Sequence, residues 1–342
     1  MPDGPSFEKR FSASLDRRAA LFASDVTDAM RLFNGHADGI DGVYVDRYGP
    51  GAVLILHDGR APESLSPGHA ADDILRFTSQ AGVRSVYIKP FARDRSGLGG
   101  AHPESLTEPT PAAGEALDQA VLIREYGLRF EVRLYDGYST GLFLDQRENR
   151  RSLAARVASL AADANRRSEP PPAVLNTFSY TGAFSVACAA AGAATTSVDI
   201  SPRYLEWAKR NFRHNGINPD GHRFARMDTF EFFAYANRKG LRYDLIILDP
   251  PSFSAANRRR KIPAWSSIEH YPRLIAQAVG LLSPGGLVFA STNTRSLTVP
   301  GRLERLIEKG LGRRPRSCEL PQRPLDFAGD PDALAAVLFS LA

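Results

Sequence analysis

The chain has 342 residues, of which 43% are hydrophobic and 24% are charged, an ordinary balance for a soluble globular protein of about two domains. A formal charge of +5 with a pI near 9.3 is compatible with a nucleic-acid partner, although a solvated basic surface accounts for it equally well. The two cysteines are isolated, which argues against a disulfide framework or a metal site. The chain has no apolar leader and no membrane-length apolar run, which argues against secretion and membrane insertion, so we expect a cytoplasmic protein.

The first third of the chain predicts a small α/β domain. Residues 1–28 have the pattern of a charged helical segment. Between residues 31 and 56, Asn-Gly and Asp-Gly pairs separate short β-branched and aromatic runs, which is typical of strands joined by tight turns. An amphipathic stretch near 70–81 and a strand at 85–91 follow.

A Pro-rich stretch, HPESLTEPTPAAGEA at 102–116, is interpreted as the linker that ends this domain. The predicted domains are therefore 1–116 and 117–342. Directly after the linker, VLIREYGLRFEVRLYDG alternates apolar and polar residues around Tyr126-Gly127, which predicts a β-hairpin at the start of the second domain.

From Gly141 onward, after a helix at 145–167, predicted strands alternate with predicted helices. The expected strands are 173–178, 195–199, 222–227, 243–249 and 286–292. The expected helices are 183–192, 202–214, 229–239, 267–282 and 300–310. Such alternation is typical of an α/β fold with a mostly parallel sheet covered by helices on both faces, where ligands bind beyond the carboxyl ends of the strands.

The turn after the first of these strands, NTFSYTGAFSV, is a candidate ligand site. Gly182 allows close backbone approach, hydroxyls of Ser179, Tyr180 and Thr181 surround it, and the following helix N-terminus favours an anionic group. A single glycine does not make the Gly-x-Gly-x-x-Gly pattern of dinucleotide binding. An ordinary strand–helix turn is the alternative interpretation.

Acidic residues follow the next two strands. Asp199 is placed to accept hydrogen bonds from both ribose hydroxyls of a nucleoside, or else to cap the helix that starts near Pro202. Asp228 is placed to accept from an adenine amino group, or else to cap the helix that begins at Thr229.

The fourth strand ends in Asp249-Pro250-Pro251, which predicts a rigid corner. Prolines donate no backbone hydrogen bond and fix φ, so the corner presents carbonyl oxygens and the Asp249 carboxylate as acceptors. Phe253 then offers an aromatic face for stacking on a base. The run Arg258, Arg259, Arg260 and Lys261 is expected to contact phosphates.

Five segments together resemble the class I S-adenosylmethionine-dependent methyltransferases, and more closely the bacterial 23S ribosomal RNA methyltransferases. They are TGLFLDQRENR (140–150), LNTFSYTGAFSV (175–186), SVDISPRYLEWAKRNFRHNG (197–216), DLIILDPPSFS (244–254) and the glycine-bearing LLSPGGLVFASTNTR (281–295). YLEWAKRNFRHNG and DPPSFS favour the guanine-N7 half of the fused K/L enzyme. Upstream, FNGHADGIDGVYVDRYG resembles the small domain of the cytosine-5 large-subunit enzyme, but its PUA domain is not expected, since only 32 residues precede this segment.

The resemblance implies a Rossmann-like methyltransferase domain preceded by the small α/β domain and the hairpin, with S-adenosylmethionine as cofactor and large-subunit ribosomal RNA as substrate. Residues 178–182 take the methionine end of the cofactor, and Asp249 lies beside the reactive methyl group and the target base. For Arg147, a salt-bridged helix start is the alternative interpretation. The implied cofactor contacts are Phe178, Ser179, Tyr180, Thr181, Gly182, Asp199, Ile200, Asp228, Thr229, Asp249, Asp145, Gln146 and Arg147.

The choice of methylated atom depends on cysteine. Carbon 5 of a pyrimidine needs a thiolate that adds to the ring first, and the cytosine-5 relative places that cysteine where this chain has FASTNTRSL (289–297). A nitrogen acceptor needs mainly positioning. We therefore expect Asp249, Pro250 and Phe253 to serve catalysis, and Asn293 either to bind the base edge or to stabilise its loop.

The predicted function is an S-adenosylmethionine-dependent RNA methyltransferase that modifies a purine nitrogen, guanine N7 or an exocyclic amine, in 23S ribosomal RNA. The alternatives are a cytosine-5 ribosomal RNA methyltransferase and a methyltransferase with a non-RNA acceptor. A nicotinamide-dependent oxidoreductase and a non-catalytic RNA-binding protein agree less well with the acidic strand ends. The pattern assigns no oligomeric state.

Overall fold

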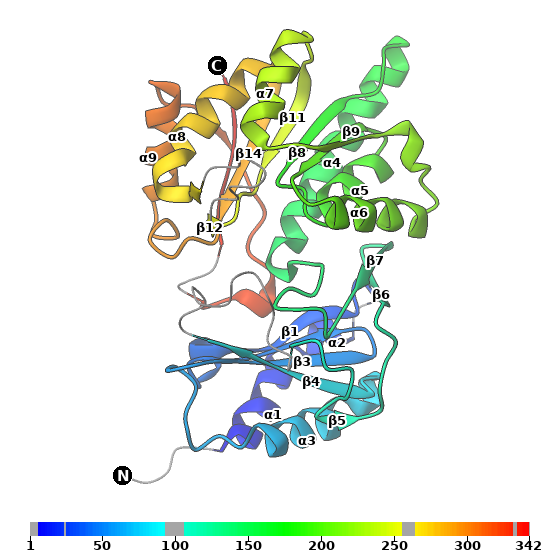
Figure 1. Cartoon of the computed structure of the whole chain (residues 1–342), viewed down its shortest axis with the longest axis vertical. Coiled ribbons are helices and arrows are strands. Elements are labelled where there is room, and N and C mark those ends of the chain that lie inside the picture. The colour runs from blue at the N-terminus through cyan, green and yellow to red at the C-terminus, as the bar shows by residue number, and fades with distance from the viewer. Residues whose placement is uncertain (1–5, 24, 93–105, 255–263, 331–333, 342) are drawn as a thin grey trace. The chain divides into compact units, whose positions relative to one another are not determined.

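The structure is a computed structural model that divides into two compact units (Figure 1). It describes residues 6–23, 25–92, 106–254, 264–330 and 334–341. Unit 1 comprises residues 1–147 and 323–330, and unit 2 comprises residues 148–322 and 331–342. Within the described ranges, no helix is long and apolar enough to cross a membrane, and no group of three or more His, Cys, Asp or Glu side chains is arranged to hold a metal ion.

The described part of unit 1 contains a five-stranded sheet with the order β1-β2-β3-β4-β5. Its strands are β1 (Ala29–Asn34), β2 (Val43–Tyr48), β3 (Gly51–His57), β4 (Ser85–Phe91) and β5 (Ala113–Gly114). Only β3 and β4 are parallel, and the chain crosses between them through α3 (Pro67–Thr78). Side chains of α1 (Phe7–Arg17) and α3 pack on one face of the sheet; the short helix α2 (Ala19–Phe22) follows α1. The predicted small α/β domain is thus confirmed.

The end of the expected Pro-rich linker is part of this sheet. Ala113 and Gly114 form β5 and pair with Val86 and Ser85 of β4. Gly114 has φ +87°, and a Cβ there would lie 2.1 Å from the carbonyl oxygen of Arg84, so only glycine fits this close pairing. Residues 102–105 of the linker lie outside the described residues.

The predicted hairpin is confirmed as the antiparallel pair β6 (Val121–Glu125) and β7 (Leu128–Val132). It belongs to unit 1, because Thr27 bridges to Glu125 and donates its hydroxyl to the carbonyl oxygen of Arg124. The division between the units consequently falls after Arg147 rather than after residue 116.

A buried ion pair joins the two segments of unit 1. The guanidinium of Arg147, 1% exposed, donates to Asp326, which is fully buried, with a shortest N–O distance of 2.6 Å. Arg147 also donates to the carbonyl oxygen of Ala29, and the Asp326 carboxylate accepts the Arg31 N–H at 2.9 Å. The alternative interpretation of Arg147 as a salt-bridged residue at a helix start is therefore confirmed, and its cofactor contact stays a prediction.

The described part of unit 2 is built around a seven-stranded sheet with the order β10-β9-β8-β11-β14-β16-β15 (Figure 1). Its strands are β8 (Ala173–Thr177), β9 (Ala194–Asp199), β10 (Arg223–Arg226), β11 (Tyr243–Leu248), β14 (Leu282–Thr292), β15 (Arg316–Cys318) and β16 (Ala335–Ser340). The first five strands in that order are parallel, and β16 is antiparallel to both of its neighbours. The predicted mostly parallel sheet is confirmed.

Both faces of this sheet are buried, which explains its continuous apolar strands. Ile246 and Leu248 of β11 pack on the face covered by α7 (Thr229–Arg238), α8 (Ser267–Ala278) and α9 (Arg302–Leu311). Leu245 and Ile247 pack on the opposite face with α4 (Arg147–Arg167) and α5 (Ala183–Ala190), and α6 (Pro202–His214) lies beside α5. A two-residue ribbon of β12 (Phe253–Ser254) and β13 (Trp265–Ser266) follows β11.

Asp326→Ala is expected to lower the free energy of unfolding by about 3–5 kcal/mol, because it leaves the buried guanidinium of Arg147 without its counter-charge. Urea denaturation measures this change. Arg323→Ala, an exposed position on the same returning segment, is the control and is expected to change stability by less than about 0.5 kcal/mol. A loss below about 1 kcal/mol in the Asp326 variant would contradict the role given to this pair.

Candidate active site

The carboxyl ends of the parallel strands meet at one edge of the unit 2 sheet. Thr177, the last residue of β8, pairs with Val198 of β9. Leu248, the last residue of β11, pairs with both Thr177 and Ala290 of β14. The residues that end or follow these strands and the adjacent β10 therefore gather at the same edge. Those predicted to be functional are Phe178, Asp199, Asp228, Asp249 and Asn293.

The turn after β8 holds two non-glycine residues in left-handed backbone conformations, with φ +54° at Phe178 and +50° at Tyr180. The N–H of Ser179 donates to the carbonyl oxygen of Val198 at 3.0 Å, and the N–H of Tyr180 donates to the Asp199 carboxylate at 2.9 Å. Backbone strain of this kind persists where surrounding contacts determine it, and it is common at functional sites.

Gly182 lies at the N-cap of α5 with φ +74°. A Cβ at this position would lie 2.7 Å from the Cβ of Ala208, so the glycine lets α5 approach α6. Packing between the two helices thus requires this glycine. The sequence predicts a second reason for it, the close approach of a ligand to the backbone. The amino end of α5 has no side-chain cap. The buried Ser179 hydroxyl makes no hydrogen bond within the described part of the chain.

At the end of β9, two backbone N–H groups hold the Asp199 carboxylate. Oδ1 accepts from Ser201 at 2.8 Å and Oδ2 accepts from Tyr180 at 2.9 Å. Burial raises the pKa of the Asp199 carboxyl to about 6, although both N–H groups favour its charged form. Because each carboxylate oxygen accepts more than one hydrogen bond, Asp199 retains capacity for two ligand hydroxyls. Its alternative role as a helix cap is wrong, since Ser201 caps α6.

Asp228 is the N-cap of α7. Its Oδ1 accepts the N–H groups of Phe230 at 2.8 Å and Glu231 at 3.4 Å. The capping interpretation is confirmed, and the adenine contact stays a prediction that would use the second carboxylate oxygen. Thr229 is buried as the first residue of α7, whereas Ile200 is 40% exposed after Asp199.

The Asp249 carboxylate is oriented from the neighbouring strand. Ser291 of β14 donates its hydroxyl to Asp249 Oδ1 at 2.6 Å. The buried Tyr271 hydroxyl of α8 donates to the carbonyl oxygen of Ser291 at 2.8 Å. Burial, and then the charge of Asp249, raise the pKa of Tyr271, so this hydroxyl keeps its proton and acts as a donor.

The sequence predicts that the carbonyl oxygens of the proline corner face outward as ligand acceptors. In the structure, not all of them do. The Pro251 carbonyl oxygen accepts from Trp265 Nε1 at 2.7 Å and from the Ser267 hydroxyl at 2.9 Å. Pro250 is buried. The corner is therefore held rigidly by the amino end of α8, and the Asp249 carboxylate is its main candidate for a ligand acceptor.

Phe253 is 66% exposed, which leaves its ring available for stacking. In the loop after β14, the Asn293 Oδ1 accepts the Ser252 hydroxyl at 2.6 Å. This bond ties the two loops together, as the loop-stabilising interpretation of Asn293 predicts, and leaves its amide nitrogen for the predicted base contact. The basic run Arg258, Arg259, Arg260 and Lys261 lies outside the described residues.

Asp145 and Gln146 lie in unit 1, in a single helical turn directly before α4. Gln146 is buried, and Asp145 interacts electrostatically with Arg31 and Tyr48. Their predicted cofactor contacts stay predictions.

Neither cysteine has the character of a nucleophile at this edge. Cys188 is fully buried within α5, and burial raises the pKa of its thiol to about 12. Cys318 ends β15, which β14 and β16 separate from β11.

Several residues that position this edge were not predicted from the sequence. Ser291, Tyr271, Trp265 and Ser267 hold the corner, and Asn211 of α6 donates its side-chain amide to the carbonyl oxygen of Thr181 at 2.9 Å. An asparagine on the apolar face of YLEWAKRNF was the available signal for Asn211. Hydrogen bonds between distant segments leave no comparable local pattern for the others.

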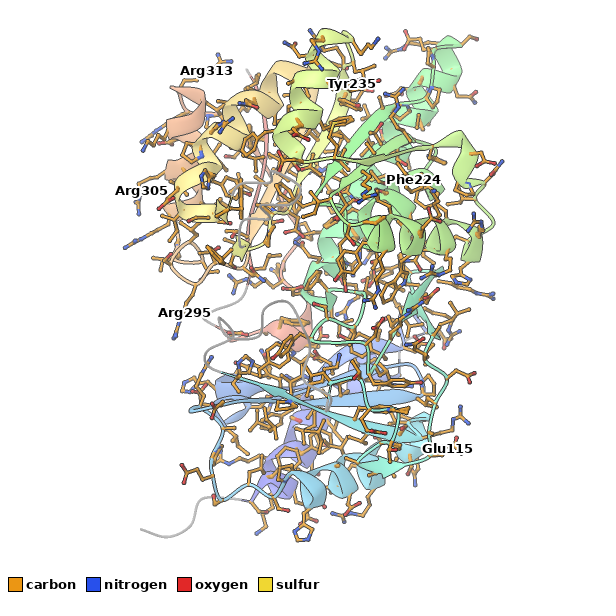
Figure 2. The ribbon with its side chains drawn as sticks, viewed as in Figure 1. Glu115, Phe224, Tyr235, Arg295, Arg305 and Arg313 are labelled. Atoms are coloured by element: carbon orange, nitrogen blue, oxygen red, sulfur yellow. The ribbon has the colours of Figure 1, made fainter. Side chains whose placement is uncertain are left out.

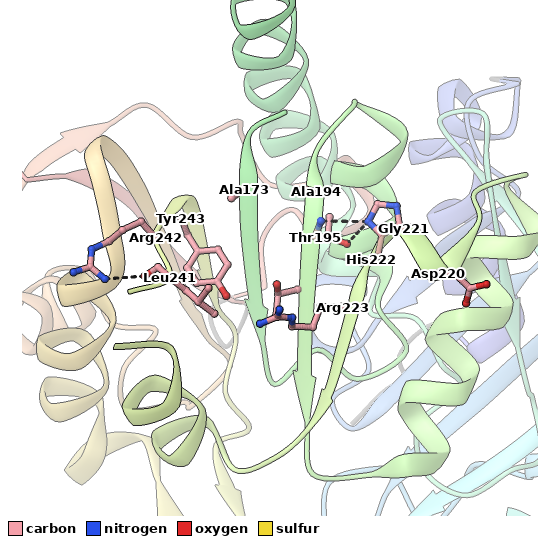
Figure 3. A pocket seen from close by; sticks show the side chains of 11 residues that line it. Ala173, Ala194, Thr195, Asp220, Gly221, His222, Arg223, Leu241, Arg242 and Tyr243 are labelled. Carbon is pink, nitrogen blue, oxygen red and sulfur yellow. Dashed lines mark hydrogen bonds between the residues drawn. The ribbon is translucent and has the colours of Figure 1, made fainter. Parts of the chain in front are cut away.

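A pocket of about 390 Å³ lies at the opposite edge of the same sheet (Figure 3). Its lining includes the first residues of four strands, Ala173, Ala194, Arg223 and Tyr243. His222 Nδ1 accepts the N–H of Thr195 there at 3.2 Å. Since ligands of parallel α/β sheets bind at carboxyl ends, this pocket is distinct from the candidate active site.

Comparisons with known proteins agree with this geometry. A family model described as S-adenosylmethionine-dependent methyltransferase matches residues 101–313. The chain is 34% identical over 293 residues to a candidate ribosomal RNA large subunit methyltransferase of Bacillus subtilis, covering 85% of this chain and 67% of that protein. It is 40% identical over 187 residues to ribosomal RNA large subunit methyltransferase K of Neisseria meningitidis, covering 54% of this chain and 49% of that protein.

Among solved structures, a methyltransferase complexed with SAH superposes with a TM-score of 0.80 and 33% identity. The match covers 99% of this chain and 83% of that one. The chain spans about half to two thirds of the length of the curated relatives that it matches.

Binding of SAH is expected to weaken as the pH falls through about 6, because protonated Asp199 no longer accepts two hydroxyls. The ligand favours the ionised carboxylate, so affinity falls by up to about tenfold for each pH unit below this value. Calorimetric titrations at several pH values measure the effect. Asp199→Asn is expected to bind weakly and without this pH dependence. Equal affinity of the unaltered protein on both sides of pH 6 would count against this role.

Proposed function

Since this chain belongs to the S-adenosylmethionine-dependent methyltransferase family, we propose that it methylates a purine nitrogen in large-subunit ribosomal RNA. The observation that carries the proposal is the corner after β11, where an oriented Asp249 carboxylate and an exposed Phe253 ring lie on one short segment. Guanine N7 and an exocyclic purine amine are the acceptors that this corner suits.

The turn after β8 and the end of β9 fit the cofactor. The buried Ser179 hydroxyl has an unused hydrogen-bonding capacity, and the uncapped amino end of α5 favours a carboxylate. Asp199 offers acceptors to ribose hydroxyls. The bound cofactor supplies an electrophilic methyl group on sulfur, and the protein's task is to align it with the target atom.

At the acceptor side, Asp249 accepts hydrogen bonds from the base edge while Ser291 fixes its orientation. Phe253 stacks on the base and limits its rotation, which contributes about 1–3 kcal/mol in such contacts. A nitrogen acceptor would need no covalent intermediate, because its lone pair would take the methyl group as the carbon–sulfur bond breaks. An exocyclic amine would in addition release one proton to solvent, whereas guanine N7 has no proton to lose. A carbon-5 acceptor would need a thiolate, and both cysteines are unsuitable.

The distribution of charge favours a polyanionic substrate for unit 2. Unit 2 contains 26 Lys and Arg against 15 Asp and Glu, a formal charge of +11, whereas unit 1 contains 17 against 23, a formal charge of −6. The modest net charge of the whole chain therefore conceals a strongly basic catalytic unit. Such a field attracts nucleic acid and raises its local concentration.

Phe253→Ala is expected to lower kcat/KM for RNA methylation by about 10- to 100-fold, because it removes the stacking surface. Phe253→Trp is expected to retain most activity. SAH affinity, measured by calorimetry, stays unchanged in both variants. Ile268→Ala, another exposed apolar position in unit 2, is the control. Equal activity of the Phe253→Ala variant and this control would contradict the stacking role.

Replacing both cysteines, Cys188→Ala with Cys318→Ser, is expected to leave the methylation rate within about threefold of the unaltered protein, because neither thiol forms a bond to the base. Transfer of a tritiated methyl group to 23S ribosomal RNA measures this rate.

Mass spectrometry of ribosomal RNA nucleosides from cells with and without the protein identifies the product. A missing 5-methylcytidine, instead of a methylated purine, would overturn the proposed acceptor.

A further inference from the structure

The helix after β14 carries basic side chains on one side only. Residues 295–316 contain seven Lys and Arg and two Asp and Glu. At about 100° per residue, Arg302, Arg305 and Lys309 fall within an arc of about 60° on α9. The two acidic residues, Glu304 and Glu308, lie outside this arc. We call Arg302, Arg305 and Lys309 the α9 basic strip.

The α9 basic strip is exposed and has no acidic partner among the described residues. On other helices of unit 2, basic side chains pair with an acidic residue three positions away, as Lys209 does with Glu206 and Arg151 with Glu148. On α9 itself, Glu308 pairs instead with Arg314, beyond the helix end. Within the described part of the chain, the charge of the strip is therefore not neutralised and can serve a bound partner. In Figure 2, Arg305 projects outward on the same flank of unit 2 as Arg295 and Arg313.

The strip follows the same edge of the sheet as the candidate active site. The loop that leads to α9 starts at the carboxyl end of β14, where Asn293 is bonded to Ser252 beside Phe253. This loop is held in place by buried Leu297 and by the Thr298 hydroxyl, which donates to the carbonyl oxygen of Arg295. Because α9 starts at this edge, Arg302 and Arg305 are the members of the strip nearest the corner.

We infer that the α9 basic strip binds the phosphate backbone of the RNA strand that continues from the base held at Phe253. The inference rests on the proposed function and adds to it the path of the substrate. Arg302 and Lys309 are separated by about 10 Å along the helix axis, which matches about three nucleotides of a stacked strand. Three exposed cations in a row suit regularly spaced phosphates, and exposed Val299 precedes them in the loop between β14 and α9.

The test compares two triple variants with equal loss of charge. The strip variant removes the α9 basic strip with the substitutions Arg302→Gln, Arg305→Gln and Lys309→Gln. The control variant removes three exposed charges from the opposite edge of the same sheet with Arg223→Gln, Lys239→Gln and Arg242→Gln. Binding of deproteinised 23S ribosomal RNA is measured by filter retention at several salt concentrations. SAH affinity is measured for both variants as a check on folding.

The strip variant is expected to bind RNA at least about tenfold more weakly than the control variant. The slope of log K against log salt is expected to fall by about 2, which corresponds to three phosphate contacts with a single strand. Equal affinity and slope in the two variants would overturn the inference. Normal binding of deproteinised RNA with loss of activity only on intact ribosomal particles would also overturn it, since the strip would then bind a protein.

The result separates this inference from the proposed function. If the unaltered protein methylates 23S ribosomal RNA while the strip variant binds that RNA as the control does, the inference alone fails. If the unaltered protein transfers no methyl group to the RNA, the proposed function fails, and the inference about substrate path fails with it.

Discussion

The parallel register of β8, β11 and β14 is the constraint on which the candidate active site depends. It places Leu248 level with Thr177 and Ala290, so the chain leaves all three strands at the same edge. The same register puts the hydroxyl of Ser291 beside Asp249. A slip of one residue in β14 would replace this donor and would turn every side chain of that strand to the opposite face. Because both faces of the sheet are packed with apolar side chains, such a slip is strongly disfavoured.

The proline corner acts together with α8. Prolines cannot donate backbone hydrogen bonds, so the rigidity of the corner comes from bonds that it accepts. The Trp265 indole N–H and the Ser267 hydroxyl both donate to the Pro251 carbonyl oxygen. The Ser267 backbone N–H donates to the Ser252 carbonyl oxygen. The indole of Trp265 also packs against Phe178 from the turn after β8. The proposed cofactor side and acceptor side are therefore mechanically connected through one aromatic residue, although they lie on separate segments.

The sequence predicts the parallel sheet and its polar strand ends well, because buried strands are continuous apolar runs and the position of ligand sites follows from topology. It does not predict β15, which has only three residues, β16, which lacks a distinctive period, or the pairing of Ala113 with β4. The partners of Asp249 and Arg147 are also missed. Their hydrogen bonds connect segments far apart in sequence, 179 residues in the pair of Arg147 and Asp326, and depend on the completed fold. Local patterns contain no information about such pairs.

The return of residues 323–330 to unit 1 has a consequence for folding during synthesis. Arg147 and the backbone N–H of Arg31 belong to the first part of the chain to leave the ribosome, but their acceptor, Asp326, is among the last. Until it arrives, unit 1 has a guanidinium that cannot be buried without a large penalty. Domains generally fold in the order of their synthesis, yet here the amino-terminal unit cannot reach its final packing first. It completes its core only after residues 148–322 of unit 2 and then Asp326 have been made, so a chain truncated before Asp326 would leave unit 1 open.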